Sequence, residues 1–260
     1  MGKYALITGA SKGIGRAIAI QLAQAGYNLF LVARSETELQ ELANYVIAAH
    51  GVKAAYLVKD LSQDNAGVLV AEWVRRSDIQ LSVLINNAGY GLWGNFAELS
   101  LDGQMNMLRL NLDATIEITY HLLPLLKKQP KAYVLNVSST AAYQALPTLA
   151  LYSASKAFIL SFSRALRYEL KDTTVSVSVL SPGPTDTGFA HRAGLDALAD
   201  LAEKFNMRPQ DVARIGLKGL FDGKAEIVPG FLNKLSAYAA KHLFKTWIER
   251  ISAGLYRHSK

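Results

Sequence analysis

The chain has 260 residues, half of them apolar and 19% charged, a balance typical of a globular α/β domain. It contains no cysteine, which excludes disulfides, thiolate nucleophiles and cysteine-ligated zinc. Its five histidines are scattered and form no His-x-x-x-His pair, so we expect no metal site. We expect a cytoplasmic protein, because the N-terminus shows no apolar leader and the lack of cysteine suits a reducing compartment.

The net charge of +7 is concentrated at the C-terminus. Residues 231–260 hold six basic side chains against the single acid Glu249, so the rest of the chain is nearly neutral. A nucleic-acid-binding domain would carry a basic stripe across the fold, and we therefore expect no nucleic-acid partner. No apolar run reaches the ~18 residues needed to span a bilayer.

Strand and helix patterns alternate along most of the chain. We predict strands at residues 4–8, 28–33, 53–58, 81–85, 133–137, 174–180 and 226–228. Between them we predict helices at residues 16–25, 36–49, 64–76, 101–126, 152–170 and 209–221. This alternation predicts an α/β fold, with one doubly wound, mostly parallel sheet of about seven strands and helices on both faces.

A glycine-rich turn joins the first strand to the first helix. Its sequence is Gly9-Ala10-Ser11-Lys12-Gly13-Ile14-Gly15. Such a turn aims backbone N–H groups and a helix N-terminus at a phosphate. The same residues match the G-x-S-x-G nucleophile elbow, but that elbow lies within an already built sheet, whereas three residues precede this strand. A glycine-rich turn without a ligand is the other alternative.

The end of the second strand bears on the choice of dinucleotide. Enzymes that prefer NAD usually carry an acid here for the ribose 2′-hydroxyl, but this chain has Ala33 followed by Arg34. Arg34 and Lys12 supply cations for a 2′-phosphate, so we expect NADP (NADPH) rather than NAD. The alternative is that Arg34 is a solvated loop residue.

Three side chains later in the sequence suggest acid/base chemistry. Ser139 ends a strand-like run, Tyr152 follows thirteen positions later, and Lys156 four positions after that. On a helix, Tyr152 and Lys156 lie on one face. An ammonium there would stabilise the phenolate and lower the pKa of Tyr152, and the serine hydroxyl could hold a carbonyl oxygen.

Taken together, the ordered motifs resemble those of the short-chain dehydrogenase/reductase family. The resemblance rests on Thr8-Gly9-x-x-x-Gly13-x-Gly15, Asn86-Asn87-Ala88-Gly89, Asn111, Ser139, Tyr152-x-x-x-Lys156 and Pro182-Gly183. It implies a Rossmann-type fold and an NAD(P)-dependent oxidoreductase acting on a carbonyl or secondary alcohol.

The resemblance also implies roles for single residues. Tyr152 would be the general acid/base, Lys156 would lower its pKa and bind the nicotinamide ribose, Ser139 would orient the substrate oxygen, and Asn111 would hold a relay water. The cofactor residues would be Gly9, Ser11, Lys12, Gly13 and Ile14 at the pyrophosphate end, Arg34, Asp60, Leu61, Asn87 and Gly89 along the adenosine, and Pro182, Gly183 and Thr187 at the nicotinamide. Asn86 is expected to tie adjacent strands together.

The residues that would line the substrate pocket are mostly apolar or aromatic. They are Tyr90, Leu92, Trp93, Ala141, Tyr143, Leu146, Phe189 and Leu195. Their character favours a small-molecule substrate with a hydrophobic ketone or acyl chain over a sugar. The alternative for about half of them is simple core packing.

We divide the chain into a dinucleotide-binding domain at residues 1–229 and a basic amphipathic helical extension at residues 230–260. Phe244, Trp247, Ile248, Ile251 and Leu255 fall on one helical stripe. Packing on the domain or on a partner in a homo-oligomer (dimer or tetramer), a lid over the substrate, and peripheral membrane contact all remain open. A non-catalytic dinucleotide sensor and a membrane-surface interaction protein are the alternative functions.

Overall fold

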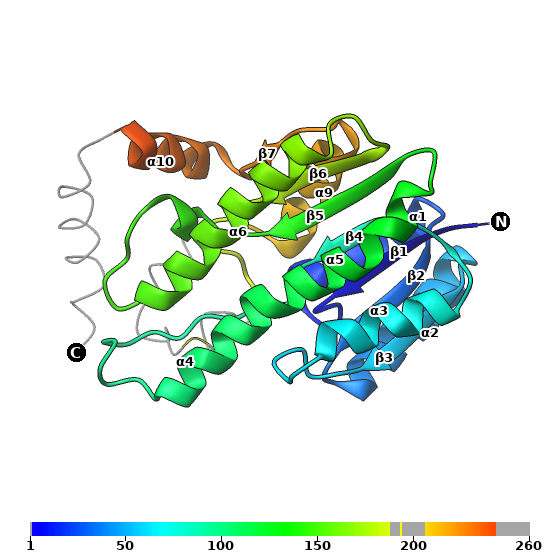
Figure 1. The fold of residues 1–260 in the computed structure, drawn as a ribbon, viewed down its shortest axis with the longest axis horizontal. Helices are drawn as coiled ribbons and strands as arrows, with labels where there is room; N and C mark the ends of the chain where they lie inside the picture. The colour runs from blue at the N-terminus through cyan, green and yellow to red at the C-terminus, as the bar shows by residue number, and fades with distance from the viewer. Residues whose placement is uncertain (1, 188–192, 194–205, 243–260) are drawn as a thin grey trace.

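The computed structural model describes residues 2–187, 193 and 206–242. Its strands form one seven-stranded sheet in the order β3-β2-β1-β4-β5-β6-β7, and every neighbouring pair is parallel (Figure 1). The predicted doubly wound sheet is confirmed. Its strands are β1 (Lys3–Thr8), β2 (Asn28–Ala33), β3 (Ala54–Val58), β4 (Gln80–Asn86), β5 (Ala132–Val137), β6 (Val175–Leu180) and β7 (Glu226–Ile227).

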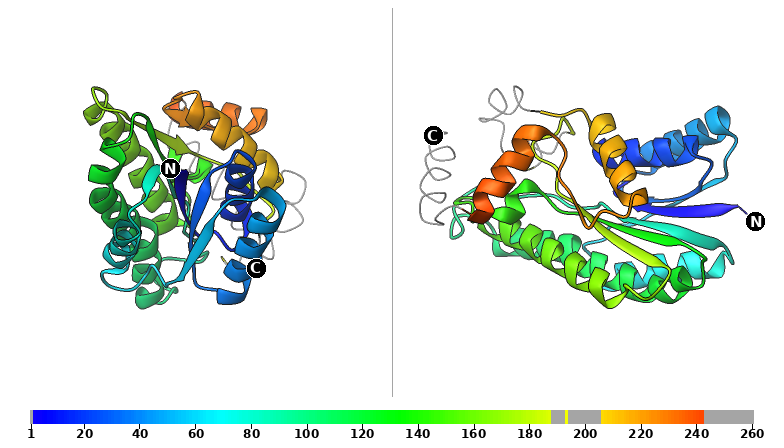
Figure 2. Two further views of the ribbon diagram at one scale, coloured as in Figure 1. Left: turned by 90° about the vertical axis from the view of Figure 1, so that its right-hand side faces the viewer. Right: turned by 90° about the horizontal axis from the view of Figure 1, so that it is seen from above.

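Helices cover both faces of the sheet (Figure 2). Helices α1 (Gly13–Gln24), α2 (Glu36–His50) and α9 (Pro209–Phe221) pack on one face, and α3 (Ala66–Arg76), α5 (Ala114–Lys127) and α6 (Ala150–Glu169) on the other. The remaining helical segments are α4 (Leu101–Leu108), η1 (Arg109–Asp113), η2 (Thr140–Tyr143) and α10 (Phe231–His242).

Strand β1, which lies inside the sheet, shows how the sequence determines both layers. Ala5 and Ile7 point to the α1 side and join the cluster that contains Ile18, whereas Leu6 points to the opposite cluster with Ile118. Each fully buried Leu or Ile contributes about 1.5–3 kcal/mol. A slip of one residue would place these side chains on the wrong faces, so the period-2 pattern sets the register.

The chain order reverses beside β1, which has β2 on one side and β4 on the other. Ligands of open α/β sheets bind at such a reversal, outside the carboxyl ends of the strands. Asn86 at the end of β4 donates hydrogen bonds to Asn136 Oδ1 (2.8 Å) and Thr119 Oγ1 (2.9 Å). The bond to Asn136 ties β4 to the adjacent strand β5, as expected, and the bond to Thr119 also joins β4 to α5.

The helix predicted at residues 101–126 is present, but it is not regular. Between α4 and α5 the chain makes the π-helical turn η1 with Asn111 at its middle. A π-helical turn holds one extra residue, and such turns are frequent at functional sites. The wider turn carries the buried Asn111 side chain toward the loop after β4, a displacement that apolar periodicity does not reveal.

The last described helix, α10, lies at the carboxyl-end side of the sheet in Figure 2. It buries Ala237 and Ala240 and exposes Phe231 (79%) and Tyr238 (64%). The apolar stripe predicted from Phe244 to Leu255 lies outside the described residues. The division of the chain at residue 229 remains a prediction.

Candidate active site

The glycine loop between β1 and α1 is shaped for close approach by a ligand. Gly9 and Gly13 have φ angles of +64° and +54°, values that glycine adopts without strain. A β-carbon on Gly15 would collide with the Gly9 carbonyl oxygen. No side chain caps α1 and no acid lies in its first turn, so its N-terminal N–H groups can take an anion. This loop fits a dinucleotide pyrophosphate.

Asn87 fastens the glycine loop to the end of β4. Its Nδ2 donates to the carbonyl oxygens of Thr8 (2.9 Å) and Gly9 (3.1 Å), and its backbone N–H donates to Thr8 Oγ1 (3.0 Å). Ala88 N–H donates to the same hydroxyl at 3.0 Å. Because both strand ends are joined, the loop is held in place before a ligand arrives.

Two ion pairs lie near the end of β2. Lys12 Nζ is 2.6 Å from Glu38 Oε1, and Arg34 Nη1 is 3.8 Å from Asp60 Oδ2. Burial raises the pKa of Asp60, but hydrogen bonds from Ser62 and the charge of Arg34 outweigh it, so the net pKa is lowered and the carboxylate stays ionised. Both predicted cations therefore face carboxylates.

Tyr152 and Lys156 lie together on the buried face of α6. Both side chains are at most 8% exposed, and Lys156 Nζ is 5.8 Å from the Tyr152 ring centroid. Lys156 Nζ also donates to the Val137 carbonyl oxygen at 3.1 Å. Burial lowers the pKa of Lys156 to about 8. The Lys156 amine is thus mostly protonated at pH 7 and loses its proton as the pH rises through about 8.

Asn111 holds three parts of the site together. Its side chain accepts from Tyr90 N–H (3.1 Å) and donates to the Tyr90 carbonyl oxygen (3.0 Å) and Ser155 Oγ (3.1 Å). It is 2% exposed. A β-carbon on Gly89 would lie 2.9 Å from Asn111 Oδ1 and 3.3 Å from Lys156 Nζ. The loop after β4, the π turn and α6 therefore meet at Gly89.

Ser139 caps the N-terminus of the short turn η2. Its Oγ accepts from Ala141 N–H at 3.1 Å, and no bond donated by this hydroxyl occurs among the described residues. The neighbouring Ser138 Oγ donates to the Lys156 carbonyl oxygen at 2.7 Å. This bond ties the Ser139 loop to α6. The hydroxyl proton of Ser139 is available to a ligand.

The loop after β6 reaches both ends of the site. Thr140 N–H donates to the Pro182 carbonyl oxygen at 2.9 Å, which links this loop to the turn after Ser139. A β-carbon on Gly13 would lie 2.8 Å from Thr187 Cβ, so Thr187 sits against the glycine loop. Leu61, which is predicted to lie along the adenosine, is 4% exposed and packs in the core.

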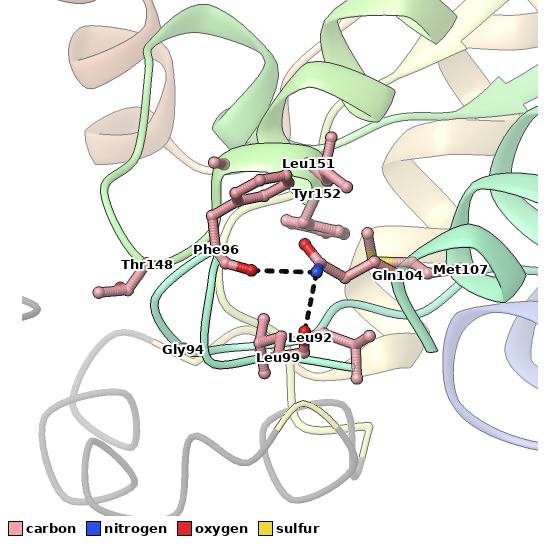
Figure 3. Close-up of a pocket in the computed structure, with 10 residues that line it drawn as sticks. Leu92, Gly94, Phe96, Leu99, Gln104, Met107, Thr148, Leu151 and Tyr152 are labelled. Carbon is pink, nitrogen blue, oxygen red and sulfur yellow. Dashed lines mark hydrogen bonds between the residues drawn. The ribbon is translucent and has the colours of Figure 1, made fainter. Parts of the chain in front are cut away.

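An apolar pocket opens beside Tyr152 (Figure 3). Gln104 spans it and donates to the carbonyl oxygens of Phe96 (3.1 Å) and Leu99 (3.2 Å). The lining residues are Leu92, Gly94, Phe96, Leu99, Gln104, Met107, Thr148, Ala150, Leu151 and Tyr152. Tyr152 thus lies between the basic side chain of Lys156 and this small pocket.

A sequence profile of the short chain dehydrogenase family matches residues 3–197. The chain belongs to the short-chain dehydrogenase/reductase family. Human 17-beta-hydroxysteroid dehydrogenase type 3 is 28% identical to it over 241 residues, covering 92% of this chain and 77% of that protein. A very-long-chain 3-oxoacyl-CoA reductase of Laccaria bicolor is 32% identical over 182 residues, covering 69% of this chain and 54% of the reductase, so the chain spans about half of that relative.

Solved structures agree. A 7beta-hydroxysteroid dehydrogenase superimposes with a TM-score of 0.87 at 24% identity, covering 97% of each chain, which shows the fold. A short-chain dehydrogenase from Sphingobium yanoikuyae in complex with NADPH gives 0.81 at 26% identity, covering 100% of this chain and 96% of that one. The present dehydrogenase is thus an NAD(P)-dependent enzyme with a nicotinamide dinucleotide cofactor.

The predicted substrate residues of this dehydrogenase do not all lie beside Tyr152. Leu146 packs with Tyr152 in a small apolar cluster that Tyr90 and Trp93 border. Tyr143 OH donates to Glu226 Oε1 at 2.7 Å, and burial together with that carboxylate raises the pKa of Tyr143. Phe189 and Leu195 lie outside the described residues. The substrate roles therefore remain predictions.

Several pocket residues of this dehydrogenase were missed from the sequence. Phe96 and Leu99 follow the same strand as Tyr90 and Trp93, so the position after β4 could have indicated them. Met107, on α4, carries no such signal, because it reaches the pocket only through the fold. Among the described residues no cluster of three His, Cys, Asp or Glu side chains could hold a metal, and no helix could cross a membrane.

Proposed function

We propose that this enzyme is an NADP-dependent oxidoreductase that interconverts a carbonyl group and a secondary alcohol on an apolar substrate of ketone or oxoacyl type. The observation that carries the proposal is the position of Tyr152. Its side chain is buried beside Lys156 and also lines the apolar pocket. A phenol in that position can exchange a proton with a substrate oxygen that reaches its hydroxyl group.

The dinucleotide, when bound, supplies or accepts the hydride. In the reductive direction Tyr152 donates its hydroxyl proton to the carbonyl oxygen, and in the oxidative direction it takes the proton of the alcohol. Protonated Lys156 stabilises the phenolate. Ser139 donates its free hydroxyl proton to the substrate oxygen as negative charge develops there. Asn111 keeps the proposed role of holding a water that connects Lys156 with solvent.

The choice of NADP rests on charge at the end of β2. Arg34 follows Ala33 where an NAD-preferring site would place an acid, and Lys12 lies in the adjoining glycine loop. Both cations sit at the surface and can rotate from their carboxylate partners toward a 2′-phosphate. Relatives of known structure include one in complex with NADPH and one in complex with NAD.

The apolar pocket supports a hydrophobic substrate. Half of its ten lining residues are leucine, phenylalanine or methionine. Trp93, which packs against the apolar cluster around Tyr152, adds a further aromatic side chain beside the pocket. The names of the relatives, a hydroxysteroid dehydrogenase and a 3-oxoacyl-CoA reductase, are compatible with this class.

A carbonyl panel tests the function. The enzyme is mixed with NADPH and with ketosteroids, aromatic ketones, 3-oxoacyl thioesters and keto sugars, and the loss of NADPH absorbance is followed. We expect turnover with the apolar carbonyls and little with the sugars. NADPH binding, seen as quenched fluorescence, without turnover of any compound would favour the dinucleotide sensor instead.

A second candidate function follows from α10. Its outward side chains Phe231, Leu232, Leu235 and Tyr238 are exposed, and the helix contains lysine but no acid. An apolar face with basic neighbours suits the surface of an anionic bilayer. This would make the enzyme a peripheral membrane protein.

The homo-oligomeric state of the enzyme, dimer or tetramer, also stays a prediction.

A further inference from the structure

Asn233, in the first turn of α10, lies directly against Gly183 in the loop after β6. A β-carbon on Gly183 would be 2.6 Å from both Cγ and Nδ2 of Asn233, and closer still to Oδ1. These two residues are 50 positions apart (233 − 183) in the sequence. Helix α10 therefore packs on the loop that is expected at the nicotinamide end of the cofactor.

The Asn233 side chain is held in this position by its own contacts. Nδ2 donates to the Pro229 carbonyl oxygen at 2.9 Å and lies 3.9 Å from Met207 Sδ. Ala237 and Ala240 of the same helix are buried, so this side of α10 packs against the rest of the protein. The amide therefore presents a fixed surface to Gly183.

Contact with Asn233 explains why residue 183 is a glycine. The φ angle of Gly183 lies outside the left-handed region, so its backbone alone would accept an alanine. What it lacks is space, because the amide of Asn233 fills the volume that a methyl group would need. The absence of a side chain at 183 allows α10 to approach.

The loop also contacts the turn after Ser139. The Pro182 carbonyl oxygen accepts the Thr140 N–H at 2.9 Å, and Thr140 follows Ser139 directly. The Pro182-Gly183 loop is thus fixed on one side by the Ser139 turn and on the other by Asn233. A shift of either contact moves the loop relative to Ser139.

We propose that Asn233 is a positioning residue for the nicotinamide end of the site. By filling the space beside Gly183 it sets how far the Pro182-Gly183 loop can move from the Ser139 turn, which makes α10 part of the active-site structure. The contact itself is independent of the proposed function. The effect of this contact on cofactor and substrate binding rests on the proposed function.

The test is a reciprocal exchange of volume between the two positions. We compare Gly183→Ala, Asn233→Ala and the double variant with the wild type by thermal unfolding and by titration with NADPH. Gly183→Ala should weaken NADPH binding and lower the melting temperature, because its methyl group collides with the amide. In the double variant the methyl enters the space left by the amide, and NADPH affinity should recover on the order of tenfold relative to Gly183→Ala.

The proposal would be overturned if the losses of NADPH affinity in Gly183→Ala and Asn233→Ala simply added in the double variant. If Gly183→Ala does not fold, Asn233→Asp provides a second test, because the Pro229 carbonyl oxygen repels the new carboxylate oxygen and the side chain can no longer be held against Gly183. Asn233→Asp should weaken NADPH binding and raise the KM for NADPH by a larger factor than it lowers kcat. The exposed control Lys234→Ala should change neither NADPH binding nor these kinetic constants. An unchanged Asn233→Asp variant would refute the role. If the wild type binds no dinucleotide, the proposed function fails. The melting temperatures of the wild type, the two single variants and the double variant still test the contact between Gly183 and Asn233.

Discussion

Replacing Lys156 with methionine removes a buried ammonium and keeps most of the side-chain volume. Burial lowers the pKa of Lys156 from 10.5 to about 8, and at 1.36 kcal/mol per pKa unit this is a penalty of about 3 kcal/mol on the charged native state. The variant also loses the hydrogen bond to the Val137 carbonyl oxygen, worth about 1 kcal/mol. We therefore expect Lys156→Met to be inactive, yet more stable than the wild type by about 1–2 kcal/mol at pH 7.

The pH dependence separates this explanation from simple repacking. Below pH 8 the native and unfolded states both carry the proton, so the penalty is fully present. Between pH 8 and 10.5 the native state has released its proton while the unfolded chain keeps it, so the wild type gains stability as the pH rises. The advantage of Lys156→Met should therefore shrink by about 2 kcal/mol between pH 7 and pH 9.5.

Urea unfolding at both pH values provides the measurement. A parallel pair in the Tyr152→Phe background removes any contribution from titration of the tyrosine. A Lys156→Met variant less stable than the wild type at pH 7, or a stability difference that does not change with pH, would show that Lys156 is not a destabilising buried cation.

The remaining predictions concern cofactor choice and α10. Arg34→Asp should weaken NADPH binding more than NADH binding, and an unchanged preference would remove Arg34 from the 2′-phosphate site. Glu38→Gln should release Lys12 from its ion pair and tighten NADPH binding about two- to fivefold with little effect on NADH, a modest gain because the pair is at the surface; equal changes for both cofactors would contradict this. The double variant Leu232→Ser, Leu235→Ser should bind anionic vesicles more weakly than the wild type in co-sedimentation, whereas equal binding would dismiss the membrane role of α10.

The sequence predicted the sheet well because buried parallel strands leave a simple local pattern. The apolar run around Ile7 and the helical rhythm around Leu22 both reflect burial in one core cluster, and burial leaves its periodic pattern in the local sequence wherever the partners lie. The glycine turn between them follows from positive φ angles, which glycine alone accepts easily. These elements needed no knowledge of long-range contacts.

Other features depend on contacts between distant segments. The π turn at Asn111 is stabilised by hydrogen bonds to Tyr90 and Ser155, which are far from it in the sequence. The ion pair between Lys12 and Glu38 joins the glycine loop to α2, which follows only after α1 and β2. Asn233 reaches Gly183 only because α10 returns to the carboxyl ends of the strands. No periodicity in the sequence indicates such pairings.

The central claim is that Tyr152 transfers the proton to the substrate oxygen while Lys156 and the glycine loop hold the cofactor. Tyr152→Phe tests it most directly, with NADPH affinity from fluorescence titration and turnover measured on the best carbonyl of the panel. We expect turnover to fall by at least about 10²–10⁴-fold while NADPH affinity stays within a few-fold of the wild type. Retained turnover, or loss of NADPH binding together with turnover, would contradict the role assigned to Tyr152.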